Sequence, residues 1–237
     1  MQHLIVGFGE VGRALYGIFS DASTIDLTDT QRYGINSVPR PFGPNTPFTM
    51  HICFPYNEKF VTDVATYQER LKPAITIIHS SVPVGTSDKL DAVYSPVRGV
   101  HPNLEQGIRT FVKYFGGFKA NEAAALFREQ GISTRVVANA RTLEAAKLWD
   151  TTVYGLQILI EKEIWDWCQA NAVDYEIVYR EFTDTYNAGY RELGMPHVVR
   201  PWLMHKDGKI GGHCVLQNAA LLDSPSARRL IKENETL

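Results

Sequence analysis

The chain has 237 residues, of which 44% are hydrophobic and 21% charged, a composition typical of globular proteins with a packed core. Its formal net charge of −2 provides no basic excess to displace counterions from nucleic-acid phosphates. No apolar run approaches the roughly 18 residues that a membrane span needs. We therefore expect no nucleic-acid partner and no membrane insertion. Because the N-terminus runs straight into a strand and not into a signal peptide, we expect a cytoplasmic protein.

The first part of the chain alternates between strands and helices. Apolar runs predict strands over residues 3–7, 23–27, 50–54, 75–79, 92–95, 113–116 and 133–137. Helical spacing predicts helices after the first strand to about Phe19, over residues 57–71 and over residues 121–130. Residues 30–48, rich in Pro, Gly and Asn, predict a long loop. This alternation favours an α/β fold with a Rossmann-type, doubly wound parallel sheet.

After about Ala140 the pattern becomes helical. Residues 142–170 contain no proline and a single glycine, Gly155, so they predict one helix of nearly thirty residues. A second helix is expected over residues 174–193, and a last one begins near Cys214 after a loop. We expect an NAD-binding Rossmann domain over residues 1–139 and a helical substrate and dimerisation domain over residues 140–237. The length of the first helix indicates a homodimer built on its apolar face.

A glycine motif lies between the first strand and the first helix. It predicts that Gly7, Phe8, Gly9, Glu10, Val11 and Gly12 bind a cofactor. In a GxGxxG of this kind the first glycine permits a tight turn, the second lets the backbone approach a pyrophosphate, and the third lets the helix pack closely on the strand. Asp26 follows nineteen residues after Gly7, where a carboxylate accepts the ribose hydroxyls of NAD and repels the 2′-phosphate of NADP. The motif therefore predicts NAD as cofactor.

Several later segments resemble the nucleotide-sugar dehydrogenases of the UDP-glucose and UDP-N-acetylmannosamine dehydrogenase type, within the 6-phosphogluconate dehydrogenase-like superfamily. The segments are His51-Ile-Cys-Phe-Pro55, Ser80-Ser81-Val-Pro-Val-Gly-Thr86, Ser95-Pro96, Glu144-Ala-Ala-Lys147-Leu148 and Gly208-Lys-Ile-Gly-Gly-His-Cys214. The resemblance places Pro55 and Ser81 beside the nicotinamide. It extends from residue 3 to about Leu222.

What the resemblance implies is an NAD-dependent oxidation of an alcohol to an acid. Cys214 would capture an intermediate aldehyde as a thiohemiacetal, and water would hydrolyse the thioester formed from it. Lys147 would stabilise the oxyanion or move protons. A cysteine that follows two glycines at a helix start lies where the helix dipole favours the thiolate.

The sequence departs from that family at three site positions. Val97 replaces the glutamate that follows Ser-Pro, Thr151 replaces an asparagine one helical turn after the lysine, and Asn218 replaces an aspartate four residues after the cysteine. Thr151 can still form a hydrogen bond, and Asn218 can orient water but cannot accept a proton. The family's C-terminal nucleotide-sugar-binding domain has no counterpart in these 237 residues. The partner expected is therefore a small molecule, with a sugar derivative as one candidate.

Two alternative functions stay open. The segment Gly99-Val-His101-Pro102, together with Ser81, resembles the prephenate dehydrogenases, in which a serine and a histidine contact the substrate hydroxyl. This predicts a two-electron dehydrogenase in which His101 accepts the proton. The second alternative is a dinucleotide-binding protein without catalysis. The spacing of His205 and His213 matches no zinc pattern, and we expect no metal site.

Overall fold

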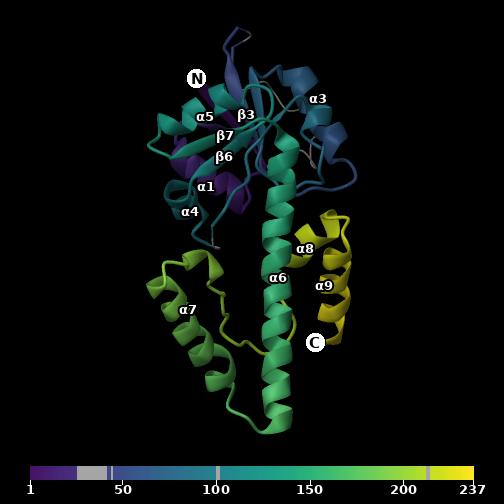
Figure 1. Ribbon diagram of the computed structural model, residues 1–237. Coiled ribbons are helices and arrows are strands. Elements are labelled where there is room, and N and C mark those ends of the chain that lie inside the picture. Colours follow the sequence, from purple (N-terminus) through teal and green to yellow (C-terminus); the bar gives the residue numbers. More distant parts are fainter. Residues whose placement is uncertain (26–41, 44, 100–101, 212–213) are drawn as a thin grey trace. The chain divides into compact units, whose positions relative to one another are not determined.

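The computed structural model describes residues 1–25, 42–43, 45–99, 102–211 and 214–237. The chain divides into two compact units, an N-terminal unit of Met1–Lys147 and a C-terminal unit of Leu148–Leu237. The boundary falls inside one long helix, α6 (Ala140–Asn171), drawn in green in Figure 1. The first two turns of α6, which carry Glu144 and Lys147, thus belong to the N-terminal unit. Among the described residues no helix is both long and apolar enough to cross a membrane.

The N-terminal unit is built on a seven-stranded sheet. Its strands are β1 (Gln2–Val6), β2 (Ser23–Ile25), β3 (Phe48–Ile52), β4 (Ile75–Ile78), β5 (Val93–Tyr94), β6 (Lys113–Gly116) and β7 (Thr134–Val137). They lie in the order β2-β1-β3-β4-β5-β6-β7, and β1 to β5 are parallel. The chain thus winds outward from β1 in both directions, which confirms the predicted doubly wound sheet and places a switch point between β1 and β3.

The last two strands depart from the expected parallel arrangement. β6 pairs with β5 in the antiparallel sense, and β7 runs parallel to β6. The connection from β5 contains only a short helix, α4 (Leu104–Thr110), which the sequence reading missed. At 1.5 Å per residue a helix of this length covers about 10 Å, and β6 starts three residues after it ends. The connection does not carry the chain back to the amino edge of the sheet, so β6 enters from the carboxyl edge.

Helices cover both faces of this sheet. The first face carries α1 (Glu10–Ile18), α4 and α5 (Ala120–Arg128), whose apolar side chains form one buried cluster with the strands. The second face carries α3 (Phe60–Leu71) and the first turns of α6. β3 and β4 are buried at every position, as the central strands of a sheet covered on both faces must be.

The C-terminal unit consists of helices packed around the rest of α6. They are α7 (Phe182–Glu192), α8 (Cys214–Leu221) and α9 (Pro225–Thr236), with a 3-10 turn, η4 (Pro196–Val198), and a π-helical turn, η3 (Glu176–Glu181). Gly155 explains how α8 and α9 pack on α6. A Cβ atom at Gly155 would lie 2.6 Å from Val215 and 2.7 Å from Leu230, so a larger residue there would push both helices away.

Two expected helices are interrupted. The helix expected over residues 174–193 begins with η3, whose wider turn precedes α7. The helix that begins at Cys214 ends at Leu221, and α9 follows it. Ser224 caps α9 by accepting a hydrogen bond from the backbone N–H of Ala227, and Pro225 starts the helix. Asp-Ser-Pro is therefore the sequence signal for this break.

Candidate functional site

The glycine loop between β1 and α1 has the geometry that a dinucleotide-binding turn requires. Gly7 has a φ of +93°, and a Cβ atom there would lie 2.8 Å from the backbone nitrogen of Phe54. At Gly12 a Cβ atom would lie 2.1 Å from the carbonyl oxygen of Gly7, so only glycine lets α1 approach β1 this closely. A Cβ atom at Gly9 would meet nothing within 4 Å. The first and third glycines are thus needed for the fold, whereas the second faces open space.

These residues fit a pyrophosphate. Gly9 is the N-cap of α1 and offers no side-chain cap, so the helix start presents backbone and not a side chain to a ligand. Glu10 is exposed and Val11 half-buried. Phe8 is half-buried, with its carbonyl oxygen accepting a hydrogen bond from Arg13 at 3.1 Å. Asp26, on which the preference for NAD rests, lies outside the described residues.

The loop that follows β4 is fixed at both ends. The Ser80 hydroxyl donates a hydrogen bond to the carbonyl oxygen of Phe54 at 2.6 Å, which ties the start of the loop to the end of β3. The buried carboxylate of Glu144 accepts hydrogen bonds from the backbone N–H groups of Gly85, at 2.5 Å, and Ser87, at 2.8 Å. Ser81 is half-buried between these two anchors. Glu144 lies within one of the sequence motifs, but the motif does not predict this role.

Lys147 and Val97 meet in the N-terminal unit. The Lys147 ammonium donates a hydrogen bond to the backbone carbonyl of Val97 at 3.0 Å, while the Val97 side chain is buried. The position that the resemblance assigns to a glutamate therefore contributes a carbonyl oxygen and no carboxylate. Pro55 follows β3 and is exposed, and His101 lies outside the described residues.

A second group of candidate residues belongs to the C-terminal unit. Cys214 is half-buried and is the first residue of α8. The Asn218 amide donates a hydrogen bond to the Thr151 hydroxyl at 3.1 Å, so two predicted site residues from α8 and α6 are brought together. Cys53 and Cys168 are buried, and burial raises the pKa of the Cys53 thiol. Cys214 is thus the least enclosed of the three thiols.

The C-terminal unit also contains a buried polar cluster that the sequence reading missed. The Glu161 carboxylate is almost fully buried and accepts a hydrogen bond from the Tyr175 hydroxyl at 2.7 Å. His205 lies 2.9 Å from the same carboxylate and stacks on Trp165, with ring centroids 4.0 Å apart. The contacts join residues up to 44 positions apart in the chain, and no local sequence motif predicts them.

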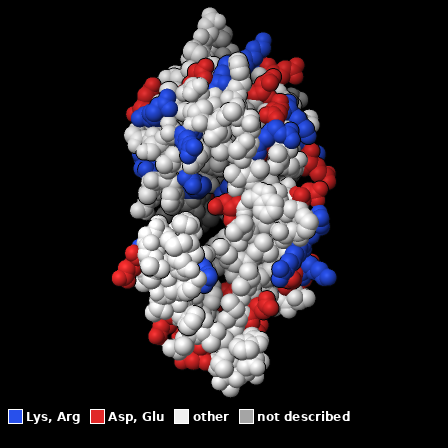
Figure 2. All heavy atoms as spheres, in the orientation of Figure 1, with Lys and Arg blue, Asp and Glu red and all other residues white. Residues whose placement is uncertain are grey.

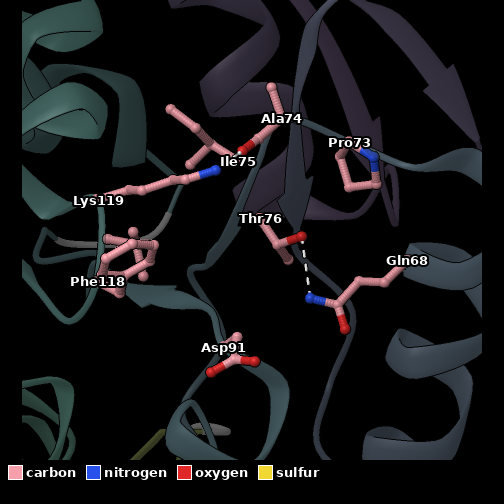
Figure 3. A pocket seen from close by; sticks show the side chains of 9 residues that line it. Gln68, Pro73, Ala74, Ile75, Thr76, Asp91, Phe118 and Lys119 are labelled. Carbon is pink, nitrogen blue, oxygen red and sulfur yellow. Dashed lines mark hydrogen bonds between the residues drawn. The ribbon is translucent and has the colours of Figure 1, made fainter.

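A pocket of about 500 Å³ lies at the opposite edge of the sheet from the glycine loop. Ile75 and Val93, the first residues of β4 and β5, line it, so it faces the amino ends of the strands. Figure 3 shows Gln68 donating a hydrogen bond to Thr76, with Lys119 on the other side. Ligands of doubly wound sheets bind at the carboxyl ends of the strands, and this pocket is therefore separate from the candidate cofactor site.

The distribution of charged side chains gives no sign of a nucleic-acid surface. On the face drawn in Figure 2, basic and acidic side chains are interspersed over the described residues without an extended patch of one sign. Within the described part of the chain, no cluster of three or more His, Cys, Asp or Glu residues could hold a metal ion.

Neither a protein-family model nor a curated protein sequence matches the chain. Solved structures do. The UDP-D-ManNAc dehydrogenase from Pyrococcus horikoshii is 18% identical with a TM-score of 0.76, and the match covers 99% of this chain and 68% of that one. A UDP-glucose dehydrogenase from Pyrobaculum islandicum is 12% identical with a TM-score of 0.67, over 99% and 68% of the two chains.

A smaller enzyme also shares the fold. The 3-hydroxyisobutyrate dehydrogenase from Mycobacterium tuberculosis is 13% identical with a TM-score of 0.65, and the match covers 99% of this chain and 92% of that one. Identities this low establish the fold alone. In fold, the chain is similar to the nucleotide-sugar dehydrogenases over 68% of their length, as its sequence motifs predicted.

Proposed function

We propose that the chain is an NAD-dependent oxidoreductase that oxidises an alcohol group on a small molecule. The observation that carries this proposal is the glycine loop, in which Gly7 and Gly12 allow close packing while Gly9 faces open space. Gly9 and the backbone at the start of α1 would hold the pyrophosphate, and Asp26 would accept the ribose hydroxyls. When bound there, NAD supplies a hydride acceptor.

The chain's own residues would supply the rest of the chemistry. Ser81 and Pro55 would line the nicotinamide side, since Pro55 follows the carboxyl end of β3, which neighbours β1, and Ser81 follows that of β4, which neighbours β3. Lys147, whose ammonium is held at the Val97 carbonyl, would stabilise an oxyanion or move a proton. Cys214 would add to an aldehyde and form a thiohemiacetal, and oxidation of that adduct to a thioester would let water release the acid. Thr151 and Asn218, joined by a hydrogen bond, would position that water.

The two-electron alternative has specific support. Val97 provides no carboxylate, and the Asn218 amide, which cannot accept a proton, is engaged with Thr151. Both weaken the hydrolytic half of a four-electron oxidation. In the alternative, Ser81 and His101 would contact the substrate hydroxyl, and Cys214 would be structural. A third possibility is that the chain binds a dinucleotide without catalysis, and the absence of turnover despite NAD binding would favour it.

Cofactor binding can be tested at Gly9. Replacing it with alanine should weaken NAD binding at least tenfold, because the new Cβ atom occupies the space reserved for the pyrophosphate. The fold should be unaffected, since the backbone of Gly9 has a φ of −74° and no atom lies within 4 Å. Calorimetric titration measures the affinity for NAD, and thermal unfolding measures the stability of the fold. Gly189→Ala in α7 is the matched control, because that glycine also has nothing within 4 Å. Unchanged NAD affinity in Gly9→Ala, or NADP binding as tight as NAD, would contradict the proposal.

Thiol reactivity tests the role of Cys214. We expect a maleimide or iodoacetamide to modify Cys214 at least tenfold faster than Cys53 or Cys168, because those two are buried whereas Cys214 is half-buried. Peptide mapping after short exposures at several pH values measures the three rates, and Cys214→Ser should remove the fast phase. If Cys53 or Cys168 reacts first in the folded protein, the thiohemiacetal mechanism fails and the reading with His101 is favoured.

The exposed face of α6 predicts a homodimer. Trp149, Val153, Ile160 and Trp167 are 41%, 45%, 50% and 56% exposed, and their spacing of four, seven and seven residues places them on one helix face. Sedimentation should show a dimer at micromolar concentration, and Ile160→Lys should shift it toward monomer. Gln169→Lys, at an exposed position nine residues from Ile160 and therefore on the opposite side of the same helix, is the control. A monomeric wild type would refute the prediction.

A further inference from the structure

Three histidines and a lysine form a continuous buried chain across the sheet of the N-terminal unit. Nδ1 of His3 lies 3.0 Å from Nε2 of His51, and Nδ1 of His51 lies 3.0 Å from Nε2 of His79. Nδ1 of His79 lies 2.9 Å from the carbonyl oxygen of Ser95 and 3.5 Å from the ammonium nitrogen of Lys113. The residues come from β1, β3, the end of β4 and β6, and each is at least 94% buried.

While Lys113 is neutral, the Ser95 carbonyl fixes the direction of every hydrogen bond in this chain. A carbonyl oxygen can only accept, so His79 must carry its proton on Nδ1 to donate to Ser95. Its Nε2 then accepts from Nδ1 of His51, and Nε2 of His51 in turn accepts from Nδ1 of His3. All three rings thus share one tautomer, and all three are neutral in this arrangement. Burial lowers the pKa of His51 and His79 well below the usual value and that of His3 to about 4.

The inner end of the chain adjoins the segment that Lys147 contacts. The Lys113 ammonium donates hydrogen bonds to the carbonyl oxygens of Ser95 and Pro96, both at 3.2 Å. Lys147 donates to the next carbonyl, that of Val97. The outer end is His3, which is 6% exposed and stacks on Phe19. The charges of the N-terminal amine and of Asp21 act on its imidazole.

We propose that His3, His51, His79 and Lys113 form a proton-transfer path through the core, which ends next to the carbonyl held by the candidate catalytic lysine. A proton that arrives on Nε2 of His3 lets the Nδ1 proton move to Nε2 of His51. His51 then passes its Nδ1 proton to His79, and His79 passes its own to the lone pair of neutral Lys113. One proton enters and one arrives, and each ring ends neutral with its proton on Nε2. Nδ1 of His79 then accepts from the charged Lys113 ammonium, which also donates to the Ser95 carbonyl. The reverse sequence restores the first state.

The surroundings of Lys113 allow it to exist in both charge states. Burial lowers its pKa to about 7, and the nearby positive charges of Lys147 and Arg98 act in the same direction, whereas Cys53 acts against them. The rings of Phe115 and Phe127 lie 5.7 and 5.3 Å from its ammonium nitrogen and favour the charged form. Near neutral pH the lysine can therefore accept or release a proton.

The purpose of the path rests on the proposed function, because oxidation of an alcohol releases a proton and the reverse reaction takes one up. Lys113 is a positioning residue in this scheme: when charged, it repels the Lys147 ammonium, which is held at the neighbouring Val97 carbonyl. The path itself needs no cofactor and no substrate, so it can be tested without either. Loss of NAD binding would overturn the proposed function and leave the path untouched.

Nitrogen NMR of ring-labelled histidine tests the path directly. At pH 8.5 we expect His3, His51 and His79 to carry the proton on Nδ1. At pH 6 we expect all three to carry it on Nε2, with one shared midpoint near the pKa of Lys113. In Lys113→Met the three rings should keep the Nδ1 proton throughout, because the acceptor is gone. In His51→Gln, His79 should still follow pH, whereas His3 should not.

His197, which is exposed and lies in the C-terminal unit, is the internal control and should give the same signals in all three proteins. Amide spectra establish that each variant is folded, and the titration of the wild type decides the matter even if neither variant folds. Rings that keep one tautomer from pH 6 to 8.5, that change at separate midpoints, or that become doubly protonated in this range would overturn the proposal.

Discussion

Replacing Glu144 with alanine is expected to lower the free energy of unfolding of the N-terminal unit by about 3–6 kcal/mol. Its buried carboxylate accepts hydrogen bonds from the N–H groups of Gly85 and Ser87, and a hydrogen bond to a charged group contributes about 1.5–3 kcal/mol. Alanine would leave both N–H groups buried without an acceptor, and the loop after β4 would then open to water. The loop should therefore lose its structure before the N-terminal unit as a whole unfolds.

The measurement must distinguish the two units. All four tryptophans (149, 165, 167 and 202) lie in the C-terminal unit, so their fluorescence reports on that unit alone. Amide hydrogen exchange read on peptides covering residues 80–87 and β4 reports on the loop and the sheet instead. In Glu144→Ala the loop peptide should lose its protection before the tryptophan signal changes.

Two further variants sharpen the comparison. Glu144→Gln keeps one acceptor oxygen and should fall between alanine and the wild type. Asp88→Asn removes a carboxylate that lies 3.8 Å from the Arg141 guanidinium, in an ion pair whose two side chains are both exposed. It should lower the free energy of unfolding by less than about 1 kcal/mol. If Glu144→Ala costs no more than Asp88→Asn, the buried carboxylate does not anchor the loop.

Features written in contiguous residues could be predicted from the sequence. The glycine loop is the clearest case, because Gly7, Gly9 and Gly12 act through contacts with the strand and helix that flank them. α6 was predicted nearly to its ends, since thirty residues without proline leave few alternatives. β6 was predicted residue for residue, but its direction was not, because direction depends on where the preceding connection leaves the chain.

The parts that escaped prediction join distant residues. Glu144 lies 57 and 59 positions from the two N–H groups that it binds, and nothing in its own helix turn indicates the partner. His3, His51 and His79 are separated by 48 and 28 positions. A usable signal did exist: each is a polar residue within or directly after an apolar strand. A buried polar residue needs a partner, and neighbouring strands are where that partner must be.

The buried histidines make acid stability the most sensitive property of the N-terminal unit. In the folded chain the pKa values of His3, His51 and His79 lie below the 6.5 of an exposed histidine. Between about pH 6.5 and pH 4 the unfolded chain therefore binds protons that the folded chain does not. The contribution of the three neutral histidines to stability is complete above pH 6.5 and is lost as the pH falls below it.

We expect the fall to be steep. Each proton bound only by the unfolded chain contributes about 1.4 kcal/mol per pH unit, so three histidines contribute up to about 4 kcal/mol per pH unit. A domain of ordinary stability, about 5–15 kcal/mol, would lose much of that stability within two pH units.

Urea unfolding at half-unit steps from pH 7 to pH 4.5, followed by hydrogen exchange in β1, β3 and β4, measures how the free energy of unfolding changes with pH. His51→Gln should reduce this slope by about 1.4 kcal/mol per pH unit, because glutamine can donate and accept in the same place but takes up no proton. His197→Gln, at an exposed position, should leave it unchanged. A slope near zero between pH 5 and pH 6.5 would mean that the three rings are already charged in the folded chain. Charged rings would place a hydrogen on both nitrogens of each imidazole, a state in which the chain from His3 to Ser95 cannot form.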